Sequence, residues 1–322
     1  ARSKHVSPVG RGGGMAIAAT AAMTGSPPRA ASPGRAAAAA AAGQPVVCNV
    51  GPREALSTLA AEFKYNASFA AKVKQLEELG YAGWRRVRGD GNCFYRAVGF
   101  GLLELIAANP GPQGERWAAE LHACLRRAPE ASEDAVHAAS WEQLLARIDR
   151  LGAGGSWGDA SATGSVLHGQ SVGAGEAAAA ELFRSFRDPG SALDLALIRG
   201  LRRVTAGHLS VHAADDEASG CGISYETLCV AQDYAGVEDF CQRVVLPEGT
   251  EGESLVMSAL PAALGIRLRI AFLDRQAASE VPFCDYGGGE EPAVGHGATA
   301  LPEVHVQLRP GHYDLLYPGR TR

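Results

Sequence analysis

The loop Gly89-Asp90-Gly91-Asn92 runs directly into Cys93, and apolar residues with helical spacing begin at that cysteine. A thiol in the first turn of a helix lies beside unpaired backbone N–H groups and the positive end of the helix dipole, and both favour thiolate over thiol. Amides of a glycine-bearing loop can also stabilise the oxyanion of a tetrahedral intermediate, by about 3 kcal/mol per donor. The segment therefore predicts a nucleophilic cysteine for acyl transfer.

A second segment, His312-Tyr313-Asp314, supplies the groups that such a nucleophile needs. On a strand, residues i and i+2 project from the same face, so the Asp314 carboxylate can hold the His312 ring in one tautomer while its other nitrogen faces a nucleophile. Cysteine, base and orienting carboxylate form the Cys-His-Asp arrangement of acyl transfer. Each segment alone is more often structural. Their combination favours the catalytic interpretation.

The patterns around these segments predict the elements that position them. Helical spacing predicts two short amphipathic helices between Leu56 and Leu79 and a further helix from Cys93 until Asn109. More helices are expected at about 114–127, 132–150, 177–187 and 190–206. Strands are expected at Ile266 to Phe272, at Val304 to Leu308 and, after the turn Arg309-Pro310-Gly311, at His312 to Tyr317 as an antiparallel return. Helices first and a small sheet late indicate an α+β fold, with the helical part packed on a small, mostly antiparallel sheet.

These motifs resemble a known family. Asp90 to Ala97 (DGNCFYRA) together with Arg309 to Asp314 (RPGHYD) resemble the otubain branch of the OTU cysteine deubiquitinases, which implies a papain-like OTU cysteine protease fold. Intervening segments resemble otubain segments in the same order, namely Leu193 to Leu209, Val237 to Cys241, Glu253 followed by Leu260 to Leu264, and Leu273 to Arg275. Two motifs at opposite ends of one domain, in family order, are a specific signal.

The resemblance implies a role for each matching residue. Cys93 is expected to be the nucleophile, His312 the general base and then the acid, and Asp314 the residue that orients the ring. Asp90 matches the aspartate ahead of the family's nucleophile and is assigned to shaping the oxyanion loop, while the backbone amides of Asp90, Gly91 and Cys93 are the expected oxyanion donors. The implied reaction is hydrolysis of the isopeptide bond after the C-terminal Gly-Gly of ubiquitin, with no cofactor and no metal.

The resemblance also sets the expected domain organisation. Residues 1–53 are low-complexity sequence that lacks the large side chains needed to offset ordering entropy. One otubain-like catalytic domain is expected over 54–318, with a Gly-rich insertion at 152–175 and a short tail at 319–322. The first segment has the composition of an organelle transit peptide. We favour the alternatives of an Ala/Gly-rich disordered tail or untranslated upstream sequence, with Met15 or Met23 as the true start.

Charge and cysteine usage limit the partners. The chain has a formal charge of −5, but residues 1–53 carry six basic side chains and no acid, so the remainder has 24 basic and 35 acidic residues. Such an acidic domain is a poor nucleic-acid binder. Seven widely spaced cysteines indicate a reducing setting, cytoplasmic or nuclear, and no run of residues is apolar enough to span a membrane. We expect a monomer that binds ubiquitin and polyubiquitin chains and, by the resemblance, ubiquitin-conjugating enzymes.

Two rival interpretations remain. Some otubains regulate ubiquitination without cleavage, by binding a ubiquitin-charged conjugating enzyme, and the intact Cys93, His312 and Asp314 favour catalysis without excluding this role. A papain-type protease outside the OTU group is disfavoured, because no glutamine stands shortly before Cys93 to supply that family's oxyanion donor. Of the other candidates, Cys241 is expected in the core, His305 as a structural hydrogen-bonding residue, and Trp84 under the active-site loop.

Overall fold

The computed structural model describes residues 48–128, 135–158, 171–252, 254–274, 280–288 and 300–319. Its strands are β1 (Val50–Glu54), β2 (Tyr81–Val87), β3 (Arg267–Phe272), β4 (Phe283–Tyr286), β5 (Glu303–Arg309) and β6 (His312–Pro318). They form one sheet in the order β1-β2-β6-β5-β3-β4, in which β3 and β5 are parallel and the other described neighbours are antiparallel. Strands from both ends of the described chain thus lie side by side in the middle of the sheet.

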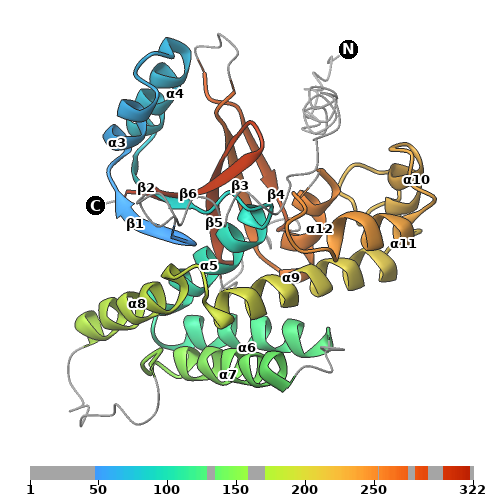
Figure 1. Ribbon diagram of the computed structural model, residues 1–322, viewed down its shortest axis with the longest axis horizontal. Coiled ribbons are helices and arrows are strands. Elements are labelled where there is room, and N and C mark those ends of the chain that lie inside the picture. Colours follow the sequence, from blue (N-terminus) through green and yellow to red (C-terminus); the bar gives the residue numbers. More distant parts are fainter. Residues whose placement is uncertain are drawn as a thin grey trace, which may run out of the picture.

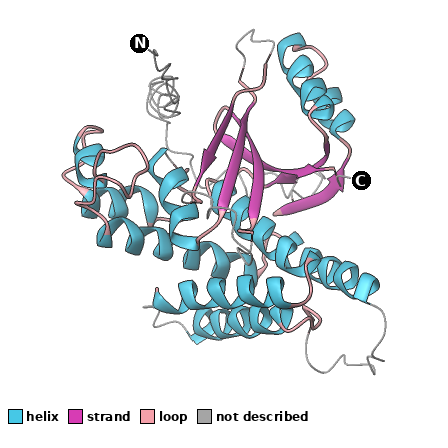
Figure 2. Cartoon of the chain, turned by 180° about the vertical axis from the view of Figure 1, so that it is seen from behind, coloured by secondary structure: helices cyan, strands magenta, loops and turns pink. Residues whose placement is uncertain are grey.

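Most helices pack on one side of this sheet (Figure 1). They are α5 (Cys93–Ala108), α6 (Pro112–Arg127), α7 (Ala135–Gly152), α8 (Ser171–Arg187), α9 (Ala192–Val211), α10 (Tyr225–Val230), α11 (Val237–Phe240), the π-helical turn η3 (Cys241–Val245) and α12 (Ser254–Leu264). Figure 2 shows the same division from behind, with the strands above and this helical layer below. The α+β fold expected from the sequence is therefore confirmed.

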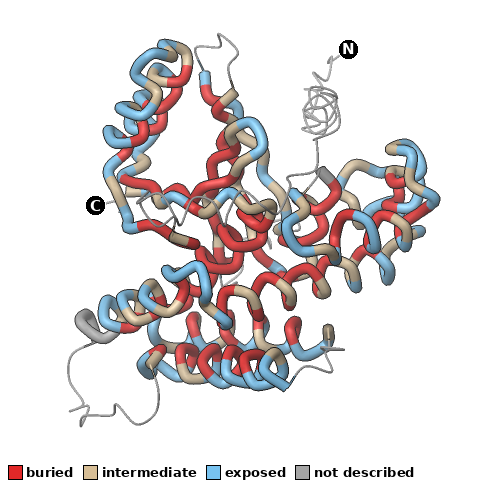
Figure 3. Tube along the Cα trace, viewed as in Figure 1, coloured by how far each residue is buried: buried red, intermediate tan, exposed pale blue. Residues whose placement is uncertain are grey.

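Helix α5 is the central element of the core, because it is buried on nearly every side (Figure 3). Apart from Arg96 and Glu104 its sequence is apolar on all sides, as expected of a helix enclosed by other elements. Two glycines allow the close packing: a Cβ at Gly101 would lie 2.8 Å from Leu315 Cδ2 of β6, and a Cβ at Gly99 would lie 2.6 Å from Leu201 Cδ1 of α9. Helix α5 is therefore held between the sheet and α9, and this fixes the position of its first residue, Cys93.

Two helices, α3 (Leu56–Glu62) and α4 (Ala67–Glu78), cover the other side of the sheet. Trp84 of β2 lies in the small core beneath them and donates from Nε1 to Thr58 Oγ1 at 2.9 Å. The expectation that Trp84 packs under the active-site loop is therefore wrong. Alternation along β2 is the reason, since neighbouring residues of a strand face opposite sides of the sheet.

The predicted elements around the two motifs are present. Both early helices, the helix at Cys93, and the antiparallel pair β5 and β6 lie where the sequence placed them, with Arg309 paired to His312 across the turn. Cys241 is buried in the main core, as expected. His305 contacts the hydroxyl of Tyr81 at 2.9 Å through Nδ1 and lies 3.2 Å from a carboxylate oxygen of Glu303, which agrees with a structural role.

The sheet begins earlier than the predicted domain start at Glu54, because β1 starts at Val50. A five-residue strand with two exposed positions and a proline carries too little alternation to be detected. The predicted insertion at 152–175 is also shorter than expected, since α8 already begins at Ser171. Residues 1–47 of the low-complexity segment, 159–170 of the insertion and 320–322 of the tail lie outside the described residues. None of the helices that the structure describes is long and apolar enough to cross a membrane.

Candidate active site

Cys93 is the first residue of α5 and is 2% exposed. In the turn before Cys93, the backbone of Gly91 packs closely against the backbone of Gly249 in a second loop. A Cβ at Gly91, whose φ is +79°, would lie 1.9 Å from the carbonyl oxygen of Gly249. Asn92 joins the same two loops, because its Oδ1 accepts a hydrogen bond of 2.9 Å from the Gly249 amide. Only glycine fits at position 91, where both the positive φ and the close contact exclude a side chain.

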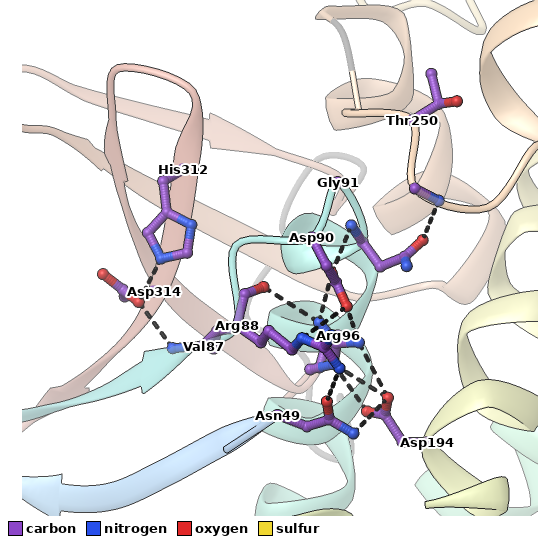
Figure 4. A network of polar contacts seen from close by, with 12 residues as sticks. Asn49, Val87, Arg88, Asp90, Gly91, Arg96, Asp194, Thr250, His312 and Asp314 are labelled. Atoms are coloured by element: carbon purple, nitrogen blue, oxygen red, sulfur yellow. Dashed lines mark hydrogen bonds and ion pairs between the residues drawn. The ribbon is translucent and has the colours of Figure 1, made fainter. Parts of the chain in front are cut away.

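The turn Pro310-Gly311 brings His312 and Asp314 to the same end of the sheet. Proline followed by a glycine with φ of +71° suits a type II turn, which reverses the chain between β5 and β6. His312 and Asp314 then lie on one face of β6, and the His312 Nε2 and Asp314 Oδ1 atoms are 2.9 Å apart (Figure 4). The predicted contact between the imidazole and the carboxylate is present.

The Asp314 carboxylate is fully buried and accepts from four groups. Its Oδ1 accepts from His312 and from the Val87 amide at 2.8 Å, and its Oδ2 accepts from Gln307 Nε2 at 3.1 Å and from the Arg309 guanidinium. Burial alone would raise the pKa of Asp314, but the hydrogen bond from His312 and the charge of Arg309 lower it. The carboxylate is therefore ionised and fixed in orientation.

His312 connects this carboxylate to Cys93. Its ring hydrogen-bonds Asp314, and Cys93 is the second group that acts on it. Burial lowers the pKa of His312, but the interactions with Asp314 and Cys93 outweigh burial and raise the pKa to about 9. Gly89 makes room for the ring, since a Cβ there would lie 3.2 Å from His312 Nδ1. The residues that the sequence singled out from two distant segments thus form a continuous Cys93, His312 and Asp314 array.

The raised pKa of His312 predicts a pH-dependent contribution to stability. Because the pKa rises from 6.5 in the unfolded chain to about 9, the folded protein holds a proton more tightly. The stabilisation is fully present below 6.5 and is lost as the pH rises through about 9. We therefore expect His312→Gln to destabilise the protein more at about pH 6 than at about pH 10, measured by urea unfolding at both pH values.

His208 provides a control of opposite sign. Burial and the neighbouring His212 lower the pKa of His208 to about 4, so its contribution is present above 6.5 and is lost as the pH falls through about 4. The destabilisation caused by His208→Gln should therefore decrease at acid pH. An effect of His312→Gln that is equal at about pH 6 and about pH 10 would contradict the raised pKa of His312.

The loop before Cys93 is held by a buried ionic network centred on Arg96 of α5 (Figure 4). Both carboxylate oxygens of Asp90 accept from Arg96, each at 2.9 Å, and Arg96 Nε also donates to Asp194 of α9 at 2.9 Å. Burial would raise the pKa of Asp90, but the hydrogen bonds and charge of Arg96 lower it. Asp90 Oδ1 in turn accepts from the Asn92 amide at 3.0 Å. The Asp90 carboxylate therefore links Arg96 to the backbone of this loop, and its role in shaping an oxyanion site stays a prediction.

The three expected oxyanion donors differ in their present contacts. The Asp90 amide donates to the Arg88 carbonyl at 3.2 Å. Within the described part of the chain, the amides of Gly91 and Cys93 make no backbone hydrogen bond outside the helix. Gly91 and Cys93 are therefore available to an oxyanion in this conformation, whereas the Asp90 amide becomes available only when its turn opens.

Asn49, just before β1, belongs to the same network although the sequence analysis placed it in the low-complexity segment. Its Nδ2 donates to Asp194 Oδ2 at 3.0 Å, and its carbonyl accepts from the Arg88 amide at 2.9 Å. Asn49 therefore ties the active-site loop to α9. We expect Asn49→Ala to destabilise the protein by about 1–3 kcal/mol and to lower turnover roughly 10-fold, measured by denaturant unfolding and steady-state kinetics.

Asn66→Ala is the matched control for this prediction. Asn66 caps α4 by accepting from the Phe69 amide at 3.1 Å, far from the network in the fold. Its loss should cost about 1 kcal/mol of stability and leave turnover unchanged. If Asn49→Ala also loses only stability, Asn49 does not act on the active-site loop.

Sequence reasoning missed most of the supporting residues. Arg96 was visible only as part of the family-like motif, and Asp194 and Asn49 carry no local signal because their partners are distant in sequence. Arg309 was assigned to the turn alone, although a residue paired with His312 across a hairpin lies close to a carboxylate two positions further along. That pairing was a usable signal for Arg309.

The chain matches the family model described as peptidase C65 otubain over residues 42–150 and 166–318. It belongs to the peptidase C65 otubain family. The matched ranges include Asp90, Cys93, His312 and Asp314, so this otubain carries its whole candidate active site within the family region.

Known relatives cover most of this otubain. The ovarian tumor domain-containing deubiquitinating enzyme 1 of Arabidopsis thaliana is 28% identical over 281 residues, 84% of this chain and 80% of the relative. The human ubiquitin thioesterase OTUB1 is 27% identical over 274 residues, 83% of this chain and 82% of the relative. A solved complex described as "The structure of h/ceOTUB1-ubiquitin aldehyde-UBCH5B~Ub" superposes with a TM-score of 0.59 at 22% identity, over 84% of this chain and 90% of that one. The otubain fold is therefore confirmed.

Proposed function

We propose that the chain is a cysteine deubiquitinase that hydrolyses the isopeptide bond after the C-terminal Gly-Gly of ubiquitin. The observation that supports this most directly is the Cys93, His312 and Asp314 array, formed from the start of a helix and the end of a sheet in an otubain. Relatives at 27% and 28% identity are named as a ubiquitin thioesterase and a deubiquitinating enzyme. The arrangement of the three residues, the family and the named relatives all favour cysteine-dependent hydrolysis of a ubiquitin conjugate.

The proposed reaction begins with a proton transfer from Cys93 to His312. Asp314 holds Nε2 of the ring, so the proton arrives at Nδ1, and the resulting imidazolium is stabilised by the buried carboxylate. The thiolate then attacks the carbonyl carbon of the last glycine: the S–C bond forms and the carbonyl electron pair moves onto oxygen. A raised pKa of about 9 keeps His312 protonated at neutral pH, which supports this charge-separated pair.

The oxyanion formed in this step is proposed to be stabilised by the amides of Gly91 and Cys93, with the Asp90 amide joining when its turn opens. Its collapse breaks the C–N bond, and the leaving lysine amine takes the proton from His312. Water, deprotonated by the same imidazole, then hydrolyses the thioester. Asp90 contributes through its carboxylate, which fixes the Asn92 amide and hence the turn.

Burial of the thiol supports a preference for glycine. Cys93 is 2% exposed, and Gly89 lies against the His312 ring, where a Cβ would be 3.2 Å from Nδ1. An extended Gly-Gly tail fits a narrow approach, whereas bulkier side chains beside the scissile bond are excluded. Specificity would then arise by rejection as much as by attraction.

A ubiquitin that carries an electrophile at its C-terminus tests this proposal. We expect a covalent adduct one ubiquitin heavier than the chain, mapped by mass spectrometry to Cys93 and absent from Cys93→Ala. Iodoacetamide labelling of the same sample checks that the thiol is reactive. No adduct with a reactive Cys93 would overturn the hydrolase assignment.

Ubiquitin-charged conjugating enzymes are proposed as further partners, because the solved relative holds UBCH5B~Ub together with ubiquitin aldehyde. If the protein forms no adduct at Cys93 with the ubiquitin electrophile but binds a ubiquitin-charged conjugating enzyme in a separate titration, a non-catalytic regulator would be supported instead. We place the protein in the cytoplasm or nucleus, where reducing conditions suit its seven free thiols.

A further inference from the structure

Arg202 of α9 is a buried cation beneath the active-site turn. The residue is 1% exposed, and its guanidinium stacks over the Tyr95 ring. The guanidinium carbon Cζ lies 4.2 Å from the ring centroid. Among the described residues it pairs with no carboxylate, in contrast to Arg96, which binds both Asp90 and Asp194. A buried charge without a counter-ion destabilises the fold unless other groups accept its hydrogen bonds.

Carbonyl and amide oxygens from separate segments accept from both terminal nitrogens of Arg202, whereas its buried Nε has no hydrogen-bond partner among the residues that the structure describes. Nη1 donates to the Val245 carbonyl at the end of η3 at 2.8 Å. Nη2 donates to the Thr250 carbonyl at 2.8 Å, to Asn92 Oδ1 at 2.8 Å and to the Gly91 carbonyl at 3.3 Å. One side chain therefore joins α9, η3 and the 249–250 loop to the two residues before Cys93.

These contacts fix a single peptide plane. The Gly91 carbonyl faces Arg202, while the N–H of the same peptide, on Asn92, faces the Asp90 carboxylate at 3.0 Å. With both ends of this peptide held, the amides of Gly91 and Cys93 on either side of it are fixed in direction. Donors that stabilise an oxyanion must be aimed before the reaction to be effective.

We propose that Arg202 is a positioning residue that holds the Gly91-Asn92 peptide so that the neighbouring amides face the oxyanion. This inference rests on the proposed function and assigns a role within the same site. Arg202 is 1% exposed, so in this proposal it acts through the turn and not by contacting the substrate. Its loss should therefore impair steps that create an oxyanion and spare those that only need the thiolate.

Arg202→Met removes the donors at similar side-chain length, and Arg202→Lys keeps the charge but loses the forked geometry. We expect kcat on a ubiquitin C-terminal amide to fall roughly 10–100-fold in Arg202→Met with little change in KM. The affinity for ubiquitin aldehyde, whose adduct carries the oxygen in the oxyanion position, should fall by a similar factor. The rate of Cys93 alkylation by iodoacetamide, which forms no oxyanion, should stay unchanged.

Arg147→Met is the matched control. Arg147 is also a buried arginine over an aromatic ring, 5.9 Å from the Trp157 centroid, but it lies on α7 away from the active-site turn. Its loss should leave kcat and aldehyde affinity unchanged. Asn92→Ala removes an acceptor of Arg202 and should lower kcat and aldehyde affinity in the same direction as Arg202→Met, and the two changes together should be less than additive.

Two results would overturn the inference. An unchanged kcat in the Arg202 variants would show that the turn keeps its conformation without the hydrogen bonds of Arg202. A loss of Cys93 alkylation that equals the loss of kcat would show that Arg202 supports the thiolate instead. If Arg202→Met does not fold, alkylation and turnover are compared in Arg202→Lys and Asn92→Ala in the same way. Turnover should fall in these variants and the alkylation rate should stay unchanged. A wild-type protein that neither cleaves ubiquitin amides nor binds ubiquitin aldehyde refutes the proposed function itself, which is a distinct outcome.

Discussion

Replacing Cys93 by serine is expected to abolish cleavage of di-ubiquitin and to leave ubiquitin binding intact. In the proposed mechanism the thiol forms the covalent intermediate, and a serine hydroxyl at the same place does not ionise with a neighbouring imidazolium. The loss should be roughly 10³-fold or more in kcat, because removal of a nucleophile removes the whole covalent route. Gel-based cleavage of di-ubiquitin and titration of ubiquitin binding measure the two effects separately.

Cys284→Ser is the matched control for the nucleophile. Cys284 is a half-buried free thiol on the edge strand β4, whereas Cys93 begins α5, and the loss of Cys284 should leave turnover unchanged. Retained turnover in Cys93→Ser would show that another residue attacks the carbonyl. A loss of binding together with turnover would show that the substitution disturbs the α5 start, and folding by circular dichroism identifies that case.

The charges around Cys93 and His312 favour the thiolate–imidazolium pair that the proposed mechanism requires. Asp314 is ionised, buried and held by four donors, so its charge acts on His312 with little screening. Cys93 starts a helix, whose first amides favour an anion. Two buried arginines contact the turn before Cys93, since Arg96 donates to the Asp90 carboxylate and Arg202 donates to Asn92 Oδ1. The active residues thus depend on a scaffold larger than themselves.

The parts of this scaffold predicted from sequence are those encoded over short distances. The helix at Cys93 follows from apolar spacing, and the β5–β6 pair follows from alternation on both sides of Pro310-Gly311. His312 and Asp314 share a face because strand geometry requires it. The meeting of Cys93 with His312 followed only from the otubain resemblance, since no local pattern joins residues so far apart.

Parts encoded by long-range contacts were not predicted. In the sequence, Arg202 looks like an ordinary basic residue of an amphipathic helix. Its proposed positioning role depends on the close contact between Gly91 and Gly249, which the sequence does not indicate. Asn49 follows a low-complexity sequence, and its importance is visible only in its hydrogen bond to Asp194, which is distant in the sequence. Short edge strands such as β4 lie below the length at which alternation is informative. A fragment intended for assays should therefore begin before Asn49, and not at Glu54.

Asp314→Asn is expected to lower kcat/KM by roughly 10²–10⁴-fold and to shift the pH dependence of the reaction to lower values. The neutral amide removes the charge that stabilises the imidazolium, so the pKa of His312 should fall from about 9 toward its ordinary value. The side chain of asparagine also carries a donor where Asp314 has only acceptors. Whichever way it turns, its NH₂ group faces donors: His312 and Val87 on one side, or Gln307 and Arg309 on the other.

Kinetics across the pH range distinguish loss of charge from loss of fold. Asp285→Asn is the control, because Asp285 is exposed on β4 and lies 3.5 Å from Arg269, so its change should leave the profile in place. In Asp314→Asn the upper limb of the profile, which reports loss of the His312 proton, should move below its wild-type position near pH 9. An unmoved limb with an unchanged rate would mean that another group orients His312. A reduced rate with an unmoved limb would mean that Asp314 supplies geometry and not charge, since only charge sets how tightly the imidazole holds its proton.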